Sequence, residues 1–306
     1  MFEEIIGHEK IKEFFEKSIA NNRLAHAYLF IGPHNVGKKT FARFLAKELL
    51  SQKIELEAHP DVTIISRICD EKTGKPKLEI AVDQIRELNT RLSHTALFPS
   101  WKIAIIEDAD TMSAATANAL LKTLEEPKGK TLIILLASNE QRILPTIKSR
   151  TQSIRFSLVE RGELVGAIMK KGYDDNEARK LTSLALGRPG IALSFAEDPE
   201  AYSQWKEVLK TRAILLSDPE YMRLRWIDKN TKGLKPEDVE RELYAWRIVL
   251  RDALLAGLGI DENRVLEESE KVNFKQVYKS LTRLTKTEDA LRQHVDPRLA
   301  FQYFIL

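Results

Sequence analysis

A glycine-rich loop near the start of the chain carries the residues best suited to bind phosphate. An apolar run, Tyr28–Ile31, leads into G-P-H-N-V-G-K, which spans Gly32 to Lys38, and a helical pattern follows. Strand, G-x-x-x-x-G-K and helix in this order predict a loop whose backbone N–H groups surround phosphate, aided by the positive end of the helix. We therefore expect Gly32, Gly37 and Lys38 to bind nucleotide phosphates.

The position after the loop lysine departs from this chemistry. A Ser or Thr hydroxyl should hold Mg²⁺ there, but the sequence has Lys39, and an ammonium offers no lone pair to a metal. Thr40 could make the metal contact only if the loop shifted register, because its side chain leaves the helix about 100° away. We predict a degenerate metal position, weak ATP or ADP binding at most, and no required cofactor. The alternative is a plain strand–turn–helix junction.

Polar side chains end two further apolar strands. Glu107 and Asp108 follow Lys102–Ile106, where ATPases with such a loop use one carboxylate to orient Mg²⁺ and the next to polarise water. The usual order is Asp-Glu, so each carboxylate moves by about 1.5 Å, and a misplacement of about 1 Å can cost a hundredfold in rate. The alternative is an acidic strand end that caps the next loop. Asn139, after Leu132–Ala137, could sense the terminal phosphate.

The elements that must position these residues alternate up to about residue 157 and are helical after Leu158. Short strands that alternate with amphipathic helices predict a parallel sheet covered on both faces. In the helical remainder, Trp205, Trp226 and Trp246 are expected to pack in a core. The predicted strands are Tyr28–Ile31, Val62–Ile65, Lys102–Ile106, Leu132–Ala137 and Ser153–Phe156, and the clearest helices are Val82–Leu92 and Ala114–Glu126, the latter capped by Ser113.

Composition excludes several classes of protein. The 306 residues are 43% hydrophobic and 30% charged, with 48 basic against 45 acidic residues, so a net charge of +3 gives no argument for nucleic-acid binding. One cysteine, Cys69, excludes an intrachain disulfide and a cysteine-based zinc site, and we expect a passive thiol and no zinc. No apolar run is long enough to span a membrane, and the acidic N-terminus does not fit a signal peptide. We expect a cytoplasmic protein.

Several segments together resemble one family. They resemble the clamp-loader branch of the AAA+ ATPases, and among these the bacterial DNA polymerase III subunits. The combination is specific, whereas each motif alone is only moderately so. The matching segments are Gly7–Glu9, Leu24–Phe30, His59–Asp61, Ile80–Leu88, Leu120–Pro127 (L-L-K-T-L-E-E-P), Ile147–Thr151 (I-K-S-R-T) and Val295–Phe304.

The resemblance implies an α/β plus all-α AAA+ fold with three domains. These would be a RecA-like phosphate-loop domain over 1–158, a small helical lid over 159–200 and a helical collar over 201–306 that oligomerises. Arg150, in the family's Ser-Arg-Cys position, would be an arginine finger that acts on a neighbour's ATP. Partners would be motor subunits and a delta-like subunit, and indirectly a sliding clamp and primer–template DNA.

Departures from the family pattern favour a non-motor subunit. The motor subunits carry a sensor arginine where this sequence has Gly190, and Arg188 is expected to be a solvent residue at a helix start. The alternative for Arg150 is a surface salt bridge worth about 0–1 kcal/mol. Two other functions stay open, an autonomous ATPase and a nucleic-acid-binding module. The latter rests only on basic residues around the loop, namely Lys38, Lys39, Arg43 and Lys47.

Overall fold

The computed structural model describes Phe2 and residues 4–50, 55–69, 77–94, 101–260, 264–266, 274–292 and 295–306. The chain forms two compact units. One comprises Met1–Leu164 and Gly187–Gly190, and the other comprises Val165–Leu186 and Ile191–Leu306. The finer division of the helical part at residue 200 stays a prediction.

The first unit is built on a five-stranded parallel sheet. The strands lie in the order β2-β3-β4-β1-β5. All five agree with the predicted strands to within one residue at each end. Strands buried on both faces appear in the sequence as short continuous apolar runs, whereas the last strand, Gln152–Arg155, is largely exposed. Their bounds are β1 Ala27–Ile31, β2 Val62–Ile65, β3 Lys102–Ile106, β4 Thr131–Ala137 and β5 Gln152–Arg155.

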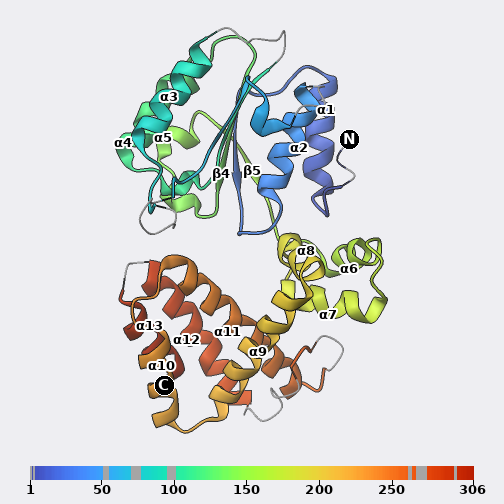
Figure 1. Ribbon diagram of the computed structural model, residues 1–306, viewed down its shortest axis with the longest axis vertical. Helices are drawn as coiled ribbons and strands as arrows, with labels where there is room; N and C mark the ends of the chain where they lie inside the picture. Colours follow the sequence, from blue (N-terminus) through green and yellow to red (C-terminus); the bar gives the residue numbers. More distant parts are fainter. Residues whose placement is uncertain are drawn as a thin grey trace. The chain divides into compact units, whose positions relative to one another are not determined.

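Helices cover both faces of this sheet (Figure 1). Helices α1 (Glu9–Ala20) and α2 (Lys38–Leu50) pack on one face, where Tyr28 and Phe30 of β1 meet an aromatic cluster with Phe15 and Phe41. Alternate residues of β1, including Leu29, point to the other face. That face is covered by α3 Val82–Ser93 and α4 Ala114–Glu125, with the short α5 Pro145–Lys148 beside them.

The rest of the described chain is helical. Trp246, Phe301 and Phe304 are buried in one core, Trp205 is 9% exposed, and Trp226 is half-buried against them. The helices are α6 Arg161–Met169, α7 Asp175–Ala185, α8 Pro189–Glu197, α9 Pro199–Ser217, α10 Glu220–Asn230, α11 Pro236–Gly257, α12 Phe274–Arg292 and α13 Pro297–Ile305, and the short 3-10 turns of the first unit are η1 Leu56–Ala58, η2 Ala109–Thr111 and η3 Glu140–Arg142.

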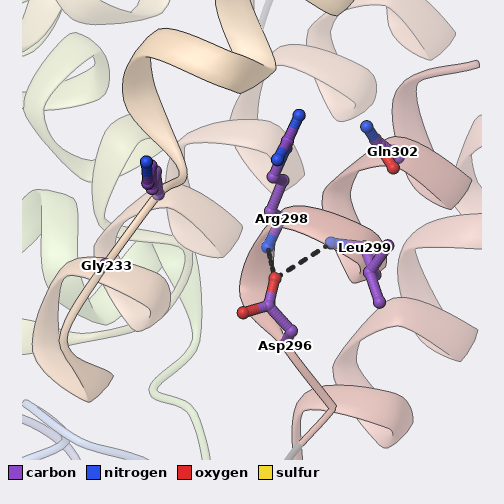
Figure 2. Close-up of a pocket in the computed structure, with 6 residues that line it drawn as sticks. Gly233, Asp296, Arg298, Leu299 and Gln302 are labelled. Carbon is purple, nitrogen blue, oxygen red and sulfur yellow. Dashed lines mark hydrogen bonds between the residues drawn. The ribbon is translucent and has the colours of Figure 1, made fainter.

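A hollow of about 500 Å³ lies at the start of α13 in the second unit (Figure 2). Its acidic group, Asp296, already caps the helix by accepting the N–H groups of Arg298 at 2.9 Å and Leu299 at 3.4 Å. The Arg298 guanidinium in turn lies 2.6 Å from the carboxylate of Asp228. The carboxylate and the guanidinium of this hollow therefore have structural partners, and we assign it no ligand.

Asp252 is a fully buried acid within α11. Its Oδ2 accepts the backbone N–H groups of Val265 at 2.6 Å and Leu266 at 2.9 Å. Burial raises the pKa of Asp252, although these hydrogen bonds, Arg251 and Arg264 oppose the shift. The carboxylate therefore fixes the segment at residues 264–266 against the helical core.

Asp252→Ala is expected to destabilise the protein by about 2 kcal/mol or more, because two backbone N–H groups lose their acceptor. The raised folded-state pKa means that protonation favours the folded state. The stabilisation that comes from protonated Asp252 is complete below the usual pKa of an aspartate. It is lost as the pH rises through the raised pKa that Asp252 has in the folded protein. Urea unfolding at neutral and mildly acidic pH checks both effects. Asp175→Ala, which breaks the exposed pair with Arg179, is the control at about 0–1 kcal/mol. Equal losses in the two variants would contradict the assignment.

Candidate functional site

The predicted phosphate loop lies between β1 and α2, at the carboxyl end of the strand. Gly32 (φ 159°) and Gly37 (φ 104°) adopt conformations that favour glycine, and Asn35 between them has φ 62°. Gly32 also passes very close to the end of β5, since a Cβ at this position would lie 2.2 Å from the backbone oxygen of Phe156. The first glycine is thus needed by the sheet as well as by the loop.

Lys38 lies under the loop and is 8% exposed. Its ammonium donates to the carbonyl oxygens of Gly32 and Pro33, the latter at 2.7 Å, and lies 3.4 Å from Ser138 Oγ. Burial lowers the pKa of Lys38 to about 8, while Asp110 and Asp108 oppose the shift. Lys38 therefore holds the loop in shape by donating to carbonyl groups of the loop itself.

Lys39 contacts the acid that a metal would need. Its Nζ lies 2.8 Å from Oε1 and 2.9 Å from Oε2 of Glu107, at the end of β3. The Glu107 side chain is 16% exposed and that of Lys39 is 57% exposed. Thr40, the alternative metal contact, lies at an exposed position in the first turn of α2. The family resemblance implies Mg²⁺ at this loop, but a carboxylate paired with an ammonium does not fit a divalent ion.

The neighbouring acids have partners that the sequence alone did not indicate. Asp108, in a left-handed conformation (φ 51°), accepts from Arg67 Nε at 3.1 Å. Asp110 accepts the backbone N–H groups of Ser138 at 3.2 Å and Asn139 at 2.8 Å, which joins the end of β3 to the end of β4. Arg67 and Asp110 are thus site residues that the sequence analysis missed. A third carboxylate two residues after the acidic pair was the available signal for Asp110.

Ser138 and Asn139, at the sensor-like position after β4, make different contacts. The Oδ1 atom of Asn139 accepts the N–H of Gln141 at 3.0 Å and caps η3. Ser138 Oγ lies 3.2 Å from His34 Nδ1 in the loop and also contacts Lys38. The side-chain contacts from the end of β4 to the loop therefore come from Ser138, one residue before the predicted Asn139, and Ala137 O accepts the N–H of Gly32 at 3.2 Å.

Gly190 approaches the loop so closely that a side chain would disturb it. Its N–H donates to Asn35 O at 2.9 Å, and a Cβ on Gly190 would lie 3.2 Å from that oxygen. The glycine that stands where motor subunits carry an arginine is thus used for a backbone contact within the first unit. Arg188, two residues earlier, is half-buried rather than a solvent residue.

Arg150 lies between α5 and β5, apart in sequence from the loop. Its Nη2 is 2.6 Å from Glu125 Oε1, its Nε donates to the same oxygen, and Nη1 donates to Thr146 O at 3.0 Å and Ser149 Oγ at 3.1 Å. The side chain is 34% exposed. In the single chain Arg150 therefore forms the surface salt bridge that was the alternative to a trans-acting role.

Most of the basic residues near the loop have protein partners. Arg43 on α2 pairs with Glu57, so Lys38, Lys39 and Arg43 all have protein partners. Because these cations are already paired, they give little support to the alternative of a nucleic-acid-binding module.

Within the described ranges no three His, Cys, Asp or Glu side chains form a group that could hold a metal, and Cys69 is exposed. Across the same residues, no helix combines the length and apolar character that a membrane span requires.

Comparison of the sequence with known proteins finds relatives among the DNA polymerase III subunits. Residues 7–160, just over half of the chain, match the family described as DNA polymerase III, delta subunit. DNA polymerase III subunit delta' of Pseudomonas aeruginosa is 38% identical over 141 residues, which are 41% of each chain. DNA polymerase III subunit tau of Bacillus subtilis is 25% identical over all of this chain and 61% of its own length. The chain thus spans less than two thirds of these relatives.

A solved structure supports the fold alone. A RuvB variant of Thermotoga maritima superimposes with a TM-score of 0.50 at 16% identity, covering 90% of this chain and 88% of the other. Together with the parallel five-stranded sheet and the phosphate loop at the end of β1, this agrees with the predicted AAA+ fold. The chain therefore belongs to the DNA polymerase III delta subunit family, within the clamp-loader branch of the AAA+ proteins.

Proposed function

We propose that this chain is a non-motor, delta'-like subunit of a bacterial DNA polymerase III clamp loader. In this role it stays in the cytoplasm, assembles with motor and delta-like subunits, and supplies Arg150 to the ATP of a neighbour during clamp loading. The observation that carries the proposal is the pair between Lys39 and Glu107, whose atoms lie 2.8 Å apart. A site whose acid is bound by the chain's own cation is poorly suited to catalysis with Mg²⁺.

Arg150 supports the other half of the proposal. A guanidinium is planar and permanently charged, and it can stabilise the charge that develops during phosphoryl transfer. Because such a finger acts on another subunit's nucleotide, it can persist in a chain whose own site has decayed. Its side chain is partly exposed and bound to Glu125, itself 47% exposed. Exchange of this carboxylate for a neighbour's phosphate is therefore sterically open and costs a surface ion pair worth about 0–1 kcal/mol.

The helical unit offers an apolar surface for assembly. Leu299, Tyr303 and Leu306 recur at intervals of four and three residues at the end of the chain and are 59%, 47% and 36% exposed. Residues with this spacing lie on one face of a helix. Phe301 and Phe304, from the same segment, are buried in the unit's own core. We assign the exposed stripe to contacts with neighbouring subunits in a collar.

The isolated chain is expected to hydrolyse ATP negligibly. Lys39 replaces the metal-holding hydroxyl, and Gly190 provides no sensor arginine. Lys39→Thr alone should not restore turnover, because Glu107 and Asp108 stand in the reverse of the usual order. Steady-state phosphate release with Mg-ATP on the purified full chain measures this. A turnover in the range of about 1–100 s⁻¹, typical of efficient phosphoryl transfer, would instead favour an autonomous, tau-like motor subunit.

A further inference from the structure

We propose that the helical unit selects its neighbour in the collar by charge, and that the partner is a helix whose exposed face carries acidic residues beside an apolar row. This inference rests on the proposed function, in which the exposed stripe of Leu299, Tyr303 and Leu306 contacts another subunit. It adds the chemistry of that subunit's surface, because a row of basic side chains on α12 runs along one side of the stripe.

Charge is distributed unevenly along α12. Residues 274–287 include no acid, although the whole chain has 45 acids among 306 residues. The bases Lys279, Arg283 and Lys286 recur at intervals of four and three residues, so they lie on one face of the helix. Lys279 and Lys286 are exposed, and Arg283 is half-buried. These three residues, the basic row, give α12 a positive face toward solvent.

The basic row lacks the partners that several bases on other helices have. None of its side chains forms an ion pair with another residue in the ranges that the structure covers, and Glu288, the first acid of α12, pairs with Arg247 of α11 at 2.7 Å. Like charges three or four residues apart destabilise a helix, so the stability of this chain does not account for the row. By contrast, several bases on α3, α7 and α9 pair with an acid three or four residues away, namely Arg86–Asp83, Arg91–Glu87, Arg179–Asp175 and Lys210–Glu207.

Helices α12 and α13 lie side by side and antiparallel (Figure 1). Thr287 Oγ1 donates to Ala300 O at 3.3 Å, and one turn earlier on α12 the guanidinium of Arg283 lies 5.7 Å from the centre of the Tyr303 ring. A cation over an aromatic face at this distance is attracted to it. The basic row and the exposed stripe therefore meet at Arg283 and Tyr303.

The same register aligns the ends of the two rows. Lys286 comes level with Leu299 at the start of α13, and Lys279 comes level with Leu306 after its end. Each row extends over about 10 Å of helix. The surface thus presents an apolar row and a positive row of equal length, next to each other.

This arrangement fits an amphipathic helix better than nucleic acid. At protein interfaces an apolar centre excludes water, and charges at the rim select the partner and speed its approach. In paired helices, the residues that flank the apolar seam set the choice of partner in the same way. Interfaces with DNA are more polar, so DNA would leave Leu299 and Leu306 unmatched. The partner surface is therefore an apolar row flanked by Asp or Glu.

Zero-length cross-linking identifies the partner surface. The wild-type chain is assembled with a tau-like motor subunit and a delta-like subunit from the same organism. The complex is treated with a carbodiimide, which joins a lysine amine to a carboxylate in contact with it. Mass spectrometry should find Lys279 and Lys286 linked to Asp or Glu residues on one helix of a neighbouring subunit.

Charge reversal measures how much the basic row contributes. The triple variant Lys279→Glu, Arg283→Glu and Lys286→Glu should bind that subunit about a hundredfold more weakly, because like charges then face each other. Reversing the linked acids of the partner to lysine should restore most of the affinity. Wild-type binding should also weaken by about tenfold between about 50 and about 500 mM salt, a result that does not depend on the folding of the triple variant.

Three exposed lysines elsewhere provide the matched control. Lys10→Glu, Lys170→Glu and Lys180→Glu together make the same change of charge, on α1, just after α6 and on α7. This control variant should bind the neighbouring subunit as the wild type does.

Three results would overturn the inference. They are an assembled complex with no cross-link at the basic row, wild-type binding that is indifferent to salt, and a folded triple variant that binds as tightly as the wild type. A short DNA duplex whose binding is lost in the triple variant, with subunit binding unchanged, would assign the row to nucleic acid instead. In each case, normal assembly leaves the proposed function in place. Failure of the wild-type chain to assemble with either subunit would contradict that function, and the inference with it.

Discussion

Arg150→Ala is expected to slow the chemical step of ATP hydrolysis at one neighbouring site by about 10³–10⁵, the effect of losing an arginine finger. The total rate of a reconstituted clamp loader should fall only partly, because its other motor sites keep their own fingers. Clamp loading should fall further, since it needs the complete assembly to act. Steady-state ATPase and clamp-loading assays with DNA and clamp present measure both effects.

Controls separate a finger from a surface residue. Arg150→Lys should rescue poorly, because a point charge cannot reproduce the two-pronged geometry of a guanidinium. Arg155→Ala removes the same charge from nearby β5, where Arg155 is 70% exposed and pairs with Glu140. It should leave both rates unchanged. Circular dichroism and gel filtration should find the Arg150→Ala chain folded and assembled. Wild-type rates for that assembly would reduce Arg150 to the salt bridge with Glu125.

Gly32→Ala is expected to destabilise the first unit by about 3 kcal/mol or more, a loss typical of strain at a fixed backbone position. The added Cβ would lie 2.2 Å from Phe156 O, a backbone atom that cannot rotate away. Phe156 also donates its own N–H to Ile31 O at 2.7 Å, so relief of the clash would disturb the pairing of β5 with β1. Urea unfolding followed by circular dichroism measures the loss.

The matched control for Gly32→Ala is Gly162→Ala. Gly162 lies in α6, and a Cβ there meets no atom within 4 Å. Alanine in a helix should leave the stability unchanged or raise it by up to about 1 kcal/mol. Equal unfolding midpoints for the two variants would mean that the end of β5 yields easily, and that the close approach of Gly32 has no structural importance.

The sequence predicted the sheet and the loop because their signals are local. Strands β1, β3 and β4 are short runs that are buried along their whole length, and the loop motif lies between one such run and a helix, so β1, its loop and α2 followed directly. Ser113 was likewise predicted as a cap and accepts the N–H of Thr116. Such signals arise within a few residues of the chain, so they can be recognised without knowledge of the tertiary structure.

The partners of the site residues could not be predicted in this way. Lys39 and Glu107 are 68 residues apart, and Arg67 and Asp108 are 41 apart. These pairs exist because β2, β3 and the start of α2 meet at one edge of the sheet, and only the register of the strands sets which side chains face each other. The role of Arg150 depends on a second chain, so it stays a prediction.

The pair between Lys39 and Glu107 also has an evolutionary consequence. Glu107 is 16% exposed, so replacing Lys39 alone would leave a mostly buried carboxylate without its ammonium, and burial of an unpaired charge is costly. Replacing Glu107 alone would cost little, because the Lys39 side chain is 57% exposed and its charge stays in water. A lineage that acquired this pair could therefore regain a metal-holding hydroxyl at position 39 only at a cost in stability. The cost falls on the step that replaces Lys39, so the pair tends to persist once it has arisen.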